Sequence, residues 1–149
     1  MKKLLTAIIA VTAIMLIAAG CQSKTETSEG HKGYSTAAVL WAEGDDVSHS
    51  VYVDFENRMI VTDNENIREE VPQDVLDEMS YLFDHYIPVI REKEKEYWPE
   101  TEEYPAMLQL FGVEFTYTDG SSYSQDGALI YPDGWDDFTG QLLSLCAEE

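Results

Sequence analysis

Residues 72–90 read PQDVLDEMSYLFDHYIPVI, and their apolar side chains recur at intervals of three and four. These side chains belong to Val75, Leu76, Met79, Leu82, Phe83, Tyr86, Ile87 and Ile90. The spacing places them on one side of an α-helix and leaves Glu78 on the other. The stretch therefore predicts a helix whose apolar stripe, centred on Leu82 and Phe83, faces a core. Pro88 removes a helical hydrogen bond, so we expect the helix to kink or stop there.

Three strands are predicted before this helix. The first covers residues 34–42 and ends at the turn-forming residues 43–46. In the second strand, apolar residues alternate with polar ones; they are Val47, Val51, Val53 and Phe55. His49 falls on the same alternate positions as these apolar residues. Such a period of two indicates a half-buried strand. Residues 58–62 predict a third strand, and the polar residues 63–70 are expected to connect it to the helix.

A second hairpin and a second helix are predicted after a charged tail or loop, residues 91–105. The hairpin has its turn at Asp119-Gly120 and returns through residues 121–125 and 128–131. Its outgoing strand carries alternating apolar residues, namely Phe111, Val113, Phe115 and Tyr117. The closing amphipathic helix follows Pro132 and carries Trp135, Phe138, Leu142, Leu143 and Leu145. The order βββ-α-ββ-α predicts a single α+β domain over residues 34–149, with an antiparallel sheet and helices packed on one face.

The N-terminal residues have the pattern of an export signal. Lys2 and Lys3 precede an uncharged, mostly apolar run from residue 4 to residue 19. This run is shorter than the roughly 20 residues that span a bilayer, and small residues follow it. Residues 1–20 are therefore predicted to be a signal peptide. Residues 21–33 contain no large apolar side chain, and they predict a flexible tether.

The sequence Ile17-Ala18-Ala19-Gly20-Cys21 resembles the lipobox of bacterial lipoproteins. The resemblance implies that the Cys21 thiol receives a diacylglyceryl group and that Cys21 becomes the mature N-terminus. The family usually has Leu where this chain has Ala18, which implies less efficient cleavage. The expected location is thus the outer face of the cell membrane, held by a lipid. A non-lipidated secreted protein and an uncleaved helix are the alternatives.

Part of the domain also resembles a group of proteins. The segment 118–122 (TDGSS), Gly127 and the segment 131–135 (YPDGW), before a Leu-rich C-terminal helix, resemble uncharacterised small lipoproteins of Gram-positive anaerobes. The matching residues are turn and helix-cap types. The resemblance implies no activity and no catalytic residue for this chain.

Charge excludes one class of partner. The chain has nine Lys and Arg and 29 Asp and Glu, a net charge of −20, and removing the leader with its two lysines leaves 7 − 29 = −22. Such a charge repels phosphate backbones, so nucleic acid is not an expected partner. The expected partners are the membrane, through the lipid anchor, and an envelope protein, a cationic peptide or a glycan.

No residue pattern predicts catalysis, a metal site or a cofactor. His31, His49 and His85 have no second His or Cys at ligand spacing. Cys146 follows three leucines and has no neighbouring positive charge, so a packing role is expected. Two acidic segments, 63–66 and 133–137, offer oxygen ligands suited to calcium, but turns and helix caps explain them as well.

Aromatic residues near a proline-rich segment suggest a ligand surface. Tyr97, Trp98 and Tyr104 are predicted to be the most exposed rings of the chain. We therefore predict a non-enzymatic binding or interaction domain displayed at the cell envelope. The alternative is an extracytoplasmic hydrolase that uses a pair of carboxylates distant in sequence, and a concave pocket with such a pair would favour it.

Overall fold

The computed structural model describes residues 33–43, 47–63, 66–94, 96–97, 109–128 and 130–147, without the side chains of residues 43, 47 and 109. All of them belong to one unit, residues 32–149. The elements in chain order are β1 (Tyr34–Glu43), β2 (Val47–Asp54), β3 (Met59–Thr62), β4 (Asn66–Arg68), α2 (Gln73–Glu92), β5 (Gln109–Tyr117), β6 (Ser122–Ala128) and α3 (Trp135–Ala147). Within these ranges, no helix combines the length and the apolar content that crossing a membrane requires.

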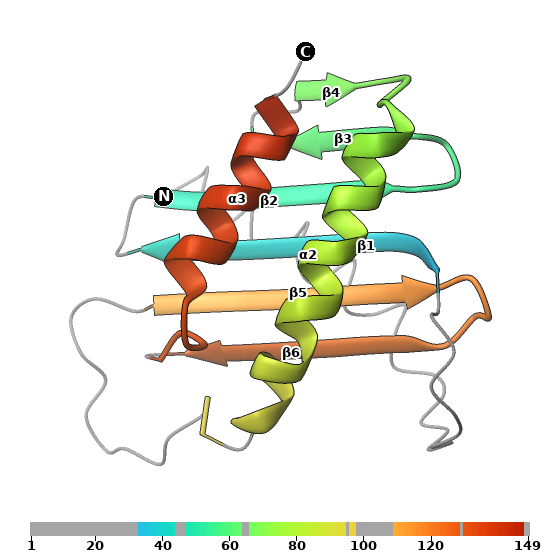
Figure 1. The fold of residues 1–149 in the computed structure, drawn as a ribbon. Coiled ribbons are helices and arrows are strands. Elements are labelled where there is room, and N and C mark those ends of the chain that lie inside the picture. Colours follow the sequence, from blue (N-terminus) through green and yellow to red (C-terminus); the bar gives the residue numbers. More distant parts are fainter. Residues whose placement is uncertain are drawn as a thin grey trace, which may run out of the picture. The chain divides into compact units, whose positions relative to one another are not determined.

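The strands form one six-stranded sheet in the order β4-β3-β2-β1-β5-β6, and each neighbouring pair is antiparallel (Figure 1). The prediction of an α+β chain with an antiparallel sheet and two helices is therefore confirmed. The turn between β5 and β6 is closed by Asp119, whose carboxylate accepts hydrogen bonds from the backbone N–H and the hydroxyl of Ser121. Gly120 allows this turn because its φ is 81°.

Strand β4 was not expected, because residues 63–70 are polar and were predicted to connect β3 to the helix. Instead, β4 pairs with β3 at the edge of the sheet, where Val61 lies opposite Ile67. Backbone hydrogen bonds form this pair, and they require no apolar side chain. Ile67 remains 60% exposed.

Helix α2 continues past Pro88 and ends at Glu92, so a stop at the proline is wrong. Contacts in the last turn compensate for the missing hydrogen bond. Ile90 is fully buried, and the guanidinium of Arg91 lies 4.4 Å from the centre of the Tyr123 ring on β6. All eight apolar residues of the predicted stripe are buried, as expected.

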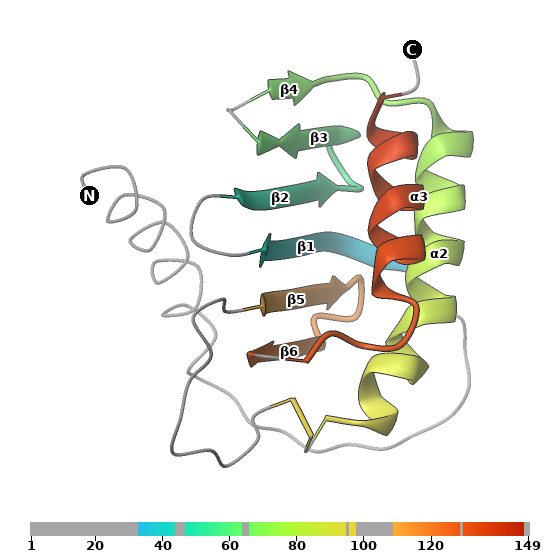
Figure 2. The same cartoon turned by 90° about the vertical axis from the view of Figure 1, so that its left-hand side faces the viewer.

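Aromatic rings connect the helices to the strands. The centroid of the Phe83 ring on α2 lies 5.0 Å from that of Phe115 on β5 and 6.2 Å from that of Phe138 on α3. The ring centroids of Trp135 on α3 and Trp41 on β1 are 6.4 Å apart. Figure 2 shows α2 and α3 on the same side of the strands. Leu143, which was expected in the apolar face of α3, is 37% exposed.

Candidate functional site

An open groove of about 980 Å³ lies between α2 and α3. It is lined by Asp77, Glu78, Tyr81, Leu82, His85, Tyr86, Val89, Asp133, Gly134, Asp137, Gln141, Ser144 and Leu145. Figure 1 shows the two helices running side by side in opposite directions, and the hydrogen bond between Tyr86 and Asp133 joins the second half of α2 to the start of α3. The groove therefore follows the length of both helices.

The apolar part of the groove is continuous with the core. Leu82 of α2 is 7% exposed and Leu145 of α3 is 8% exposed, so each covers core residues and presents only its edge to the groove. The Tyr86 ring stacks on Phe138 with centroids 4.4 Å apart. This ring pair is a direct contact between α2 and α3.

One end of the groove depends on a glycine. The hydroxyl of Tyr86 donates to the carbonyl oxygen of Asp133 over 2.8 Å. A Cβ atom at Gly134 would collide with this hydroxyl, and Gly134 also has a φ of 71°. Burial, with the negative charges of Asp137 and Asp133, raises the pKa of Tyr86, so the hydroxyl keeps its proton for the hydrogen bond.

The rim of the groove is acidic. Four carboxylates line it, and all are exposed: Asp77 and Glu78 on α2, Asp137 on α3 and Asp133 just before α3. Among the described lining residues there is no Lys or Arg. At one end, Lys93 Nζ lies 2.7 Å from Asp133 Oδ2, and this hydrogen bond raises the pKa of the lysine. Lys93 therefore offsets part of the negative charge at this end of the groove.

An exposed aromatic ring stands beside these carboxylates. Tyr81 is 76% exposed, the largest exposed fraction among the described large hydrophobic residues. It lies one helical turn from both Asp77 and His85 on α2. A ring in this position is available to a partner, because the core does not cover it.

These carboxylates are poorly placed for acid–base catalysis. A carboxyl group that acts as a general acid near neutral pH is usually withdrawn from water, as in a hydrophobic pocket. The four groove carboxylates are exposed instead. The groove is therefore better suited to binding than to proton transfer.

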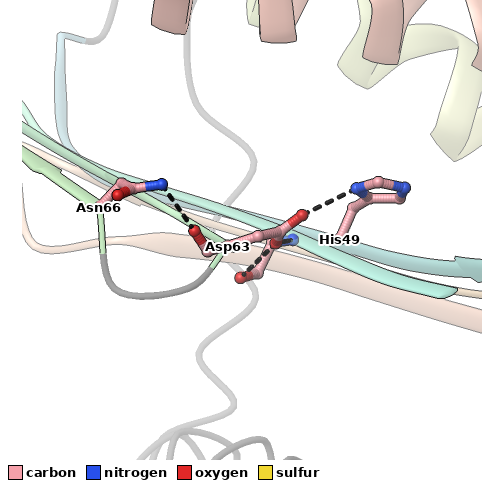
Figure 3. A network of polar contacts seen from close by, with 4 residues as sticks. His49, Asp63 and Asn66 are labelled. Atoms are coloured by element: carbon pink, nitrogen blue, oxygen red, sulfur yellow. Dashed lines mark hydrogen bonds and ion pairs between the residues drawn. The ribbon is translucent and has the colours of Figure 1, made fainter.

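A second polar group lies where β2 meets the end of β3 (Figure 3). His49 Nδ1 is 2.8 Å from Asp63 Oδ2, and Asp63 also accepts hydrogen bonds from the backbone and hydroxyl of Ser50. The His49 ring stacks on Trp41 with centroids 5.0 Å apart. Because Ser50 bonds to the carboxylate rather than to the imidazole, these residues do not have the arrangement of a Ser–His–Asp triad. They link β2 to the residue that follows β3.

Tyr97, Trp98 and Tyr104 were predicted to be exposed and to form a ligand surface. For Tyr97 the prediction of exposure is wrong, because its side chain is fully buried. Its carbonyl accepts a hydrogen bond from the Ala128 N–H, and its ring lies 4.9 Å from Phe111. The tyrosine thus packs against the end of β6 and the core. Trp98, Tyr104 and the predicted lipidation site Cys21 lie outside the described residues.

The structure also places the other residues considered from the sequence. His85 is exposed, and its neighbour Asp84 accepts a hydrogen bond from Tyr34. Cys146 is partly buried against the core, and burial raises the pKa of its thiol to about 11. In the described part of the chain, no three His, Cys, Asp or Glu side chains are grouped so as to hold a metal ion.

Some exposed apolar side chains lie on the sheet rather than between the helices. Tyr52 is 36% exposed and Leu110 is 38% exposed. Tyr52 alternates with the buried Val51 and Val53, so it lies on the sheet face opposite the core. The described residues of this face show no charge pattern that would indicate what kind of partner binds there.

Sequence reasoning named some of the groove residues, among them the segment 133–137 and His85, but it missed the groove because its residues come from two helices that are far apart in the sequence. One signal was available, since Tyr81 is a large aromatic residue outside the predicted apolar stripe. The chain matches no protein-family model, and no curated protein and no solved structure shows significant similarity to it.

Proposed function

We propose that this chain is a lipid-anchored protein of the bacterial cell envelope whose domain binds a partner and catalyses no reaction. The N-terminal pattern supports the location, since an apolar leader ends in Ala18-Ala19-Gly20-Cys21. In this proposal, Cys21 carries the lipid on the outer face of the membrane. Residues 22–33 separate the domain from the bilayer.

The observation that carries the binding function is the groove between α2 and α3. It combines an exposed aromatic ring, Tyr81, with exposed carboxylates on both sides. In the proposed architecture the two helices form one layer packed on one face of the sheet, so the outer side of this layer faces partners. The ring contacts of Phe83 and Trp135 with the strands support this layer.

Membrane anchoring is tested by fractionating cells that produce the full chain or Cys21→Ala. We expect the wild-type chain in the membrane fraction, with an acylated residue 21 at its N-terminus by intact mass. The variant should be released or should keep its leader. A wild-type chain with an unmodified N-terminus at another residue contradicts the proposed anchor.

Binding is tested by capturing partners from detergent-solubilised envelopes with the full chain. We expect a protein that is retained by the wild type and by Tyr52→Ala, and lost with Tyr81→Ala. Tyr52 is a suitable control because it is also an exposed tyrosine, on the sheet. The proposal is contradicted if no retained protein depends on Tyr81, or if the purified chain hydrolyses peptide or glycan substrates at an enzymatic rate.

A further inference from the structure

We infer that the groove binds a basic amphipathic α-helix of a partner protein, which lies along α2 and α3. This inference rests on the proposed binding function and specifies the chemistry of the partner. Three properties of the groove carry it: its length, its charge and its exposed apolar surface.

The length of the groove suits a short helix. On α2 the lining residues extend from Asp77 to Val89, which corresponds to roughly 18 Å at 1.5 Å per residue. On α3 they extend from Asp137 to Leu145 in the opposite direction (Figure 1). The channel between two side-by-side helices can accept the ridge of side chains of a third helix. A partner helix of about three turns would fill it.

The charge of the groove determines the sign of the partner. Asp77 and Glu78 stand on one helix and Asp137 on the other, and the lining residues that the structure describes include no Lys or Arg. Lys and Arg side chains along the edges of a bound helix would face these carboxylates. The net charge of the chain without its leader, 7 − 29 = −22, adds attraction at long range, which speeds the encounter with a basic partner.

The apolar surface explains why the partner is amphipathic rather than merely basic. Tyr81 is 76% exposed midway along the α2 side, and the edges of Leu82 and Leu145 lie in the same groove. Aromatic rings at the centre of an interface commonly contribute most of its binding energy. The apolar stripe of a partner helix would cover Tyr81, while its basic residues contact the rim.

The test measures binding of fluorescein-labelled peptides to the full chain in non-ionic detergent at low salt, by fluorescence anisotropy. The first peptide has 14 residues, with Leu at helical spacing and Lys elsewhere. The second has the same composition in scrambled order, and the third has Glu in place of Lys. We expect saturable binding of the first peptide, at least tenfold weaker binding of the second and no binding of the third.

Matched variants locate the binding site. Asp137→Asn and Asp136→Asn make the same charge change at adjacent exposed positions in the first turn of α3, but only Asp137 lines the groove. We expect Asp137→Asn to weaken binding about threefold and Asp136→Asn to leave it unchanged, since a rim charge contributes modestly. Tyr81→Ala should weaken binding about tenfold, as expected for a central aromatic residue. Circular dichroism of each variant confirms that it folds.

Several results would overturn the inference. Equal losses in the two Asp variants, unchanged binding in Tyr81→Ala, or equal binding of the scrambled peptide would each indicate non-specific attraction to an acidic surface. If these results occur while an envelope protein still depends on Tyr81 for capture, the proposed binding function stands and only the basic helix is wrong. If these results occur and no captured envelope protein depends on Tyr81, both the basic helix and the proposed binding function are wrong.

Discussion

The hydroxyl of Tyr34 donates a hydrogen bond of 2.6 Å to Asp84 Oδ1, which connects the first residue of β1 to the middle of α2. Tyr34 is 5% exposed, and its ring also packs against Phe83 and Phe115. A carboxylate of α2 thus has a specific partner on the sheet. This bond connects the helix to β1, one of the two central strands of the sheet.

Loss of this hydrogen bond should destabilise the fold. Tyr34→Phe should lower the free energy of unfolding by roughly 1 to 3 kcal/mol, because the bond that is lost is a partly buried hydrogen bond to a charged carboxylate. Tyr97→Phe is the matched control, since the Tyr97 hydroxyl is buried and has no hydrogen-bond partner among the residues that the structure describes. It should change stability by less than about 0.5 kcal/mol or increase it. Urea melts at pH 7 measure both, and equal losses would show that the bond to Asp84 contributes nothing.

Alkaline pH should destabilise the domain. Burial raises the pKa of Tyr97 to about 12, and it also raises the pKa of Tyr34. Tyrosines of the unfolded chain have a pKa of about 10. Above pH 10 the unfolded state therefore loses protons first, and the free energy of unfolding falls as pH rises. The fall should be shallower in Tyr97→Phe. Urea melts between pH 8 and pH 11.5 check this, and a flat pH dependence would contradict it.

Two glycines near the groove should respond in opposite ways to alanine. Gly134→Ala should cost roughly 1 to 3 kcal/mol, because Gly134 has a positive φ and its new Cβ would collide with the Tyr86 hydroxyl. Gly140 lies inside α3 with open space around it, so Gly140→Ala should stabilise the chain by about 0.5 to 1 kcal/mol. Denaturant melts give the sign of each change. A stabilising Gly134→Ala would show that the turn before α3 can adopt another conformation.

The apolar stripe of α2 can be tested with a core residue and a surface residue. Phe83→Ala should destabilise by roughly 3 to 5 kcal/mol, because it removes a fully buried ring and leaves a cavity. Glu78→Ala, on the exposed side, should stay within about 0.5 kcal/mol. Chemical denaturation of the two variants decides the matter. Similar losses would mean that α2 presents another face to the core.

The sequence was sufficient for the features that depend on local pattern. The stripe from Val75 to Ile90 repeats with the helical period, so both the helix and its buried face could be predicted. The alternation from Phe111 to Tyr117 predicted β5 in the same way. Strand β4 could not be predicted, because its polar residues pair through the backbone at a sheet edge. Helix α2 continues past Pro88 because long-range contacts of Ile90 and Arg91 hold its last turn.

The candidate site depended on contacts that no local pattern contains. Asp77 and Asp137 line the same groove only because α2 and α3 lie side by side. His49 and Asp63 meet through the pairing of β2 with β3, which is a matter of register. Tyr97 was misassigned because it lies near a proline-rich segment in the sequence, whereas its burial comes from Phe111 and the end of β6.

Site-specific photo-cross-linking in living cells tests the central claim most directly. A benzoylphenylalanine in place of Tyr81 keeps an aromatic ring in the groove of the full, anchored chain. The same residue in place of Tyr52 or Leu143 reports on exposed positions that do not line the groove. We predict a discrete protein adduct at position 81, absent at the other two positions, whose cross-linked peptide is a basic amphipathic helix. Adducts at position 52 or 143 with none at 81 would contradict the assignment of the groove as the binding site.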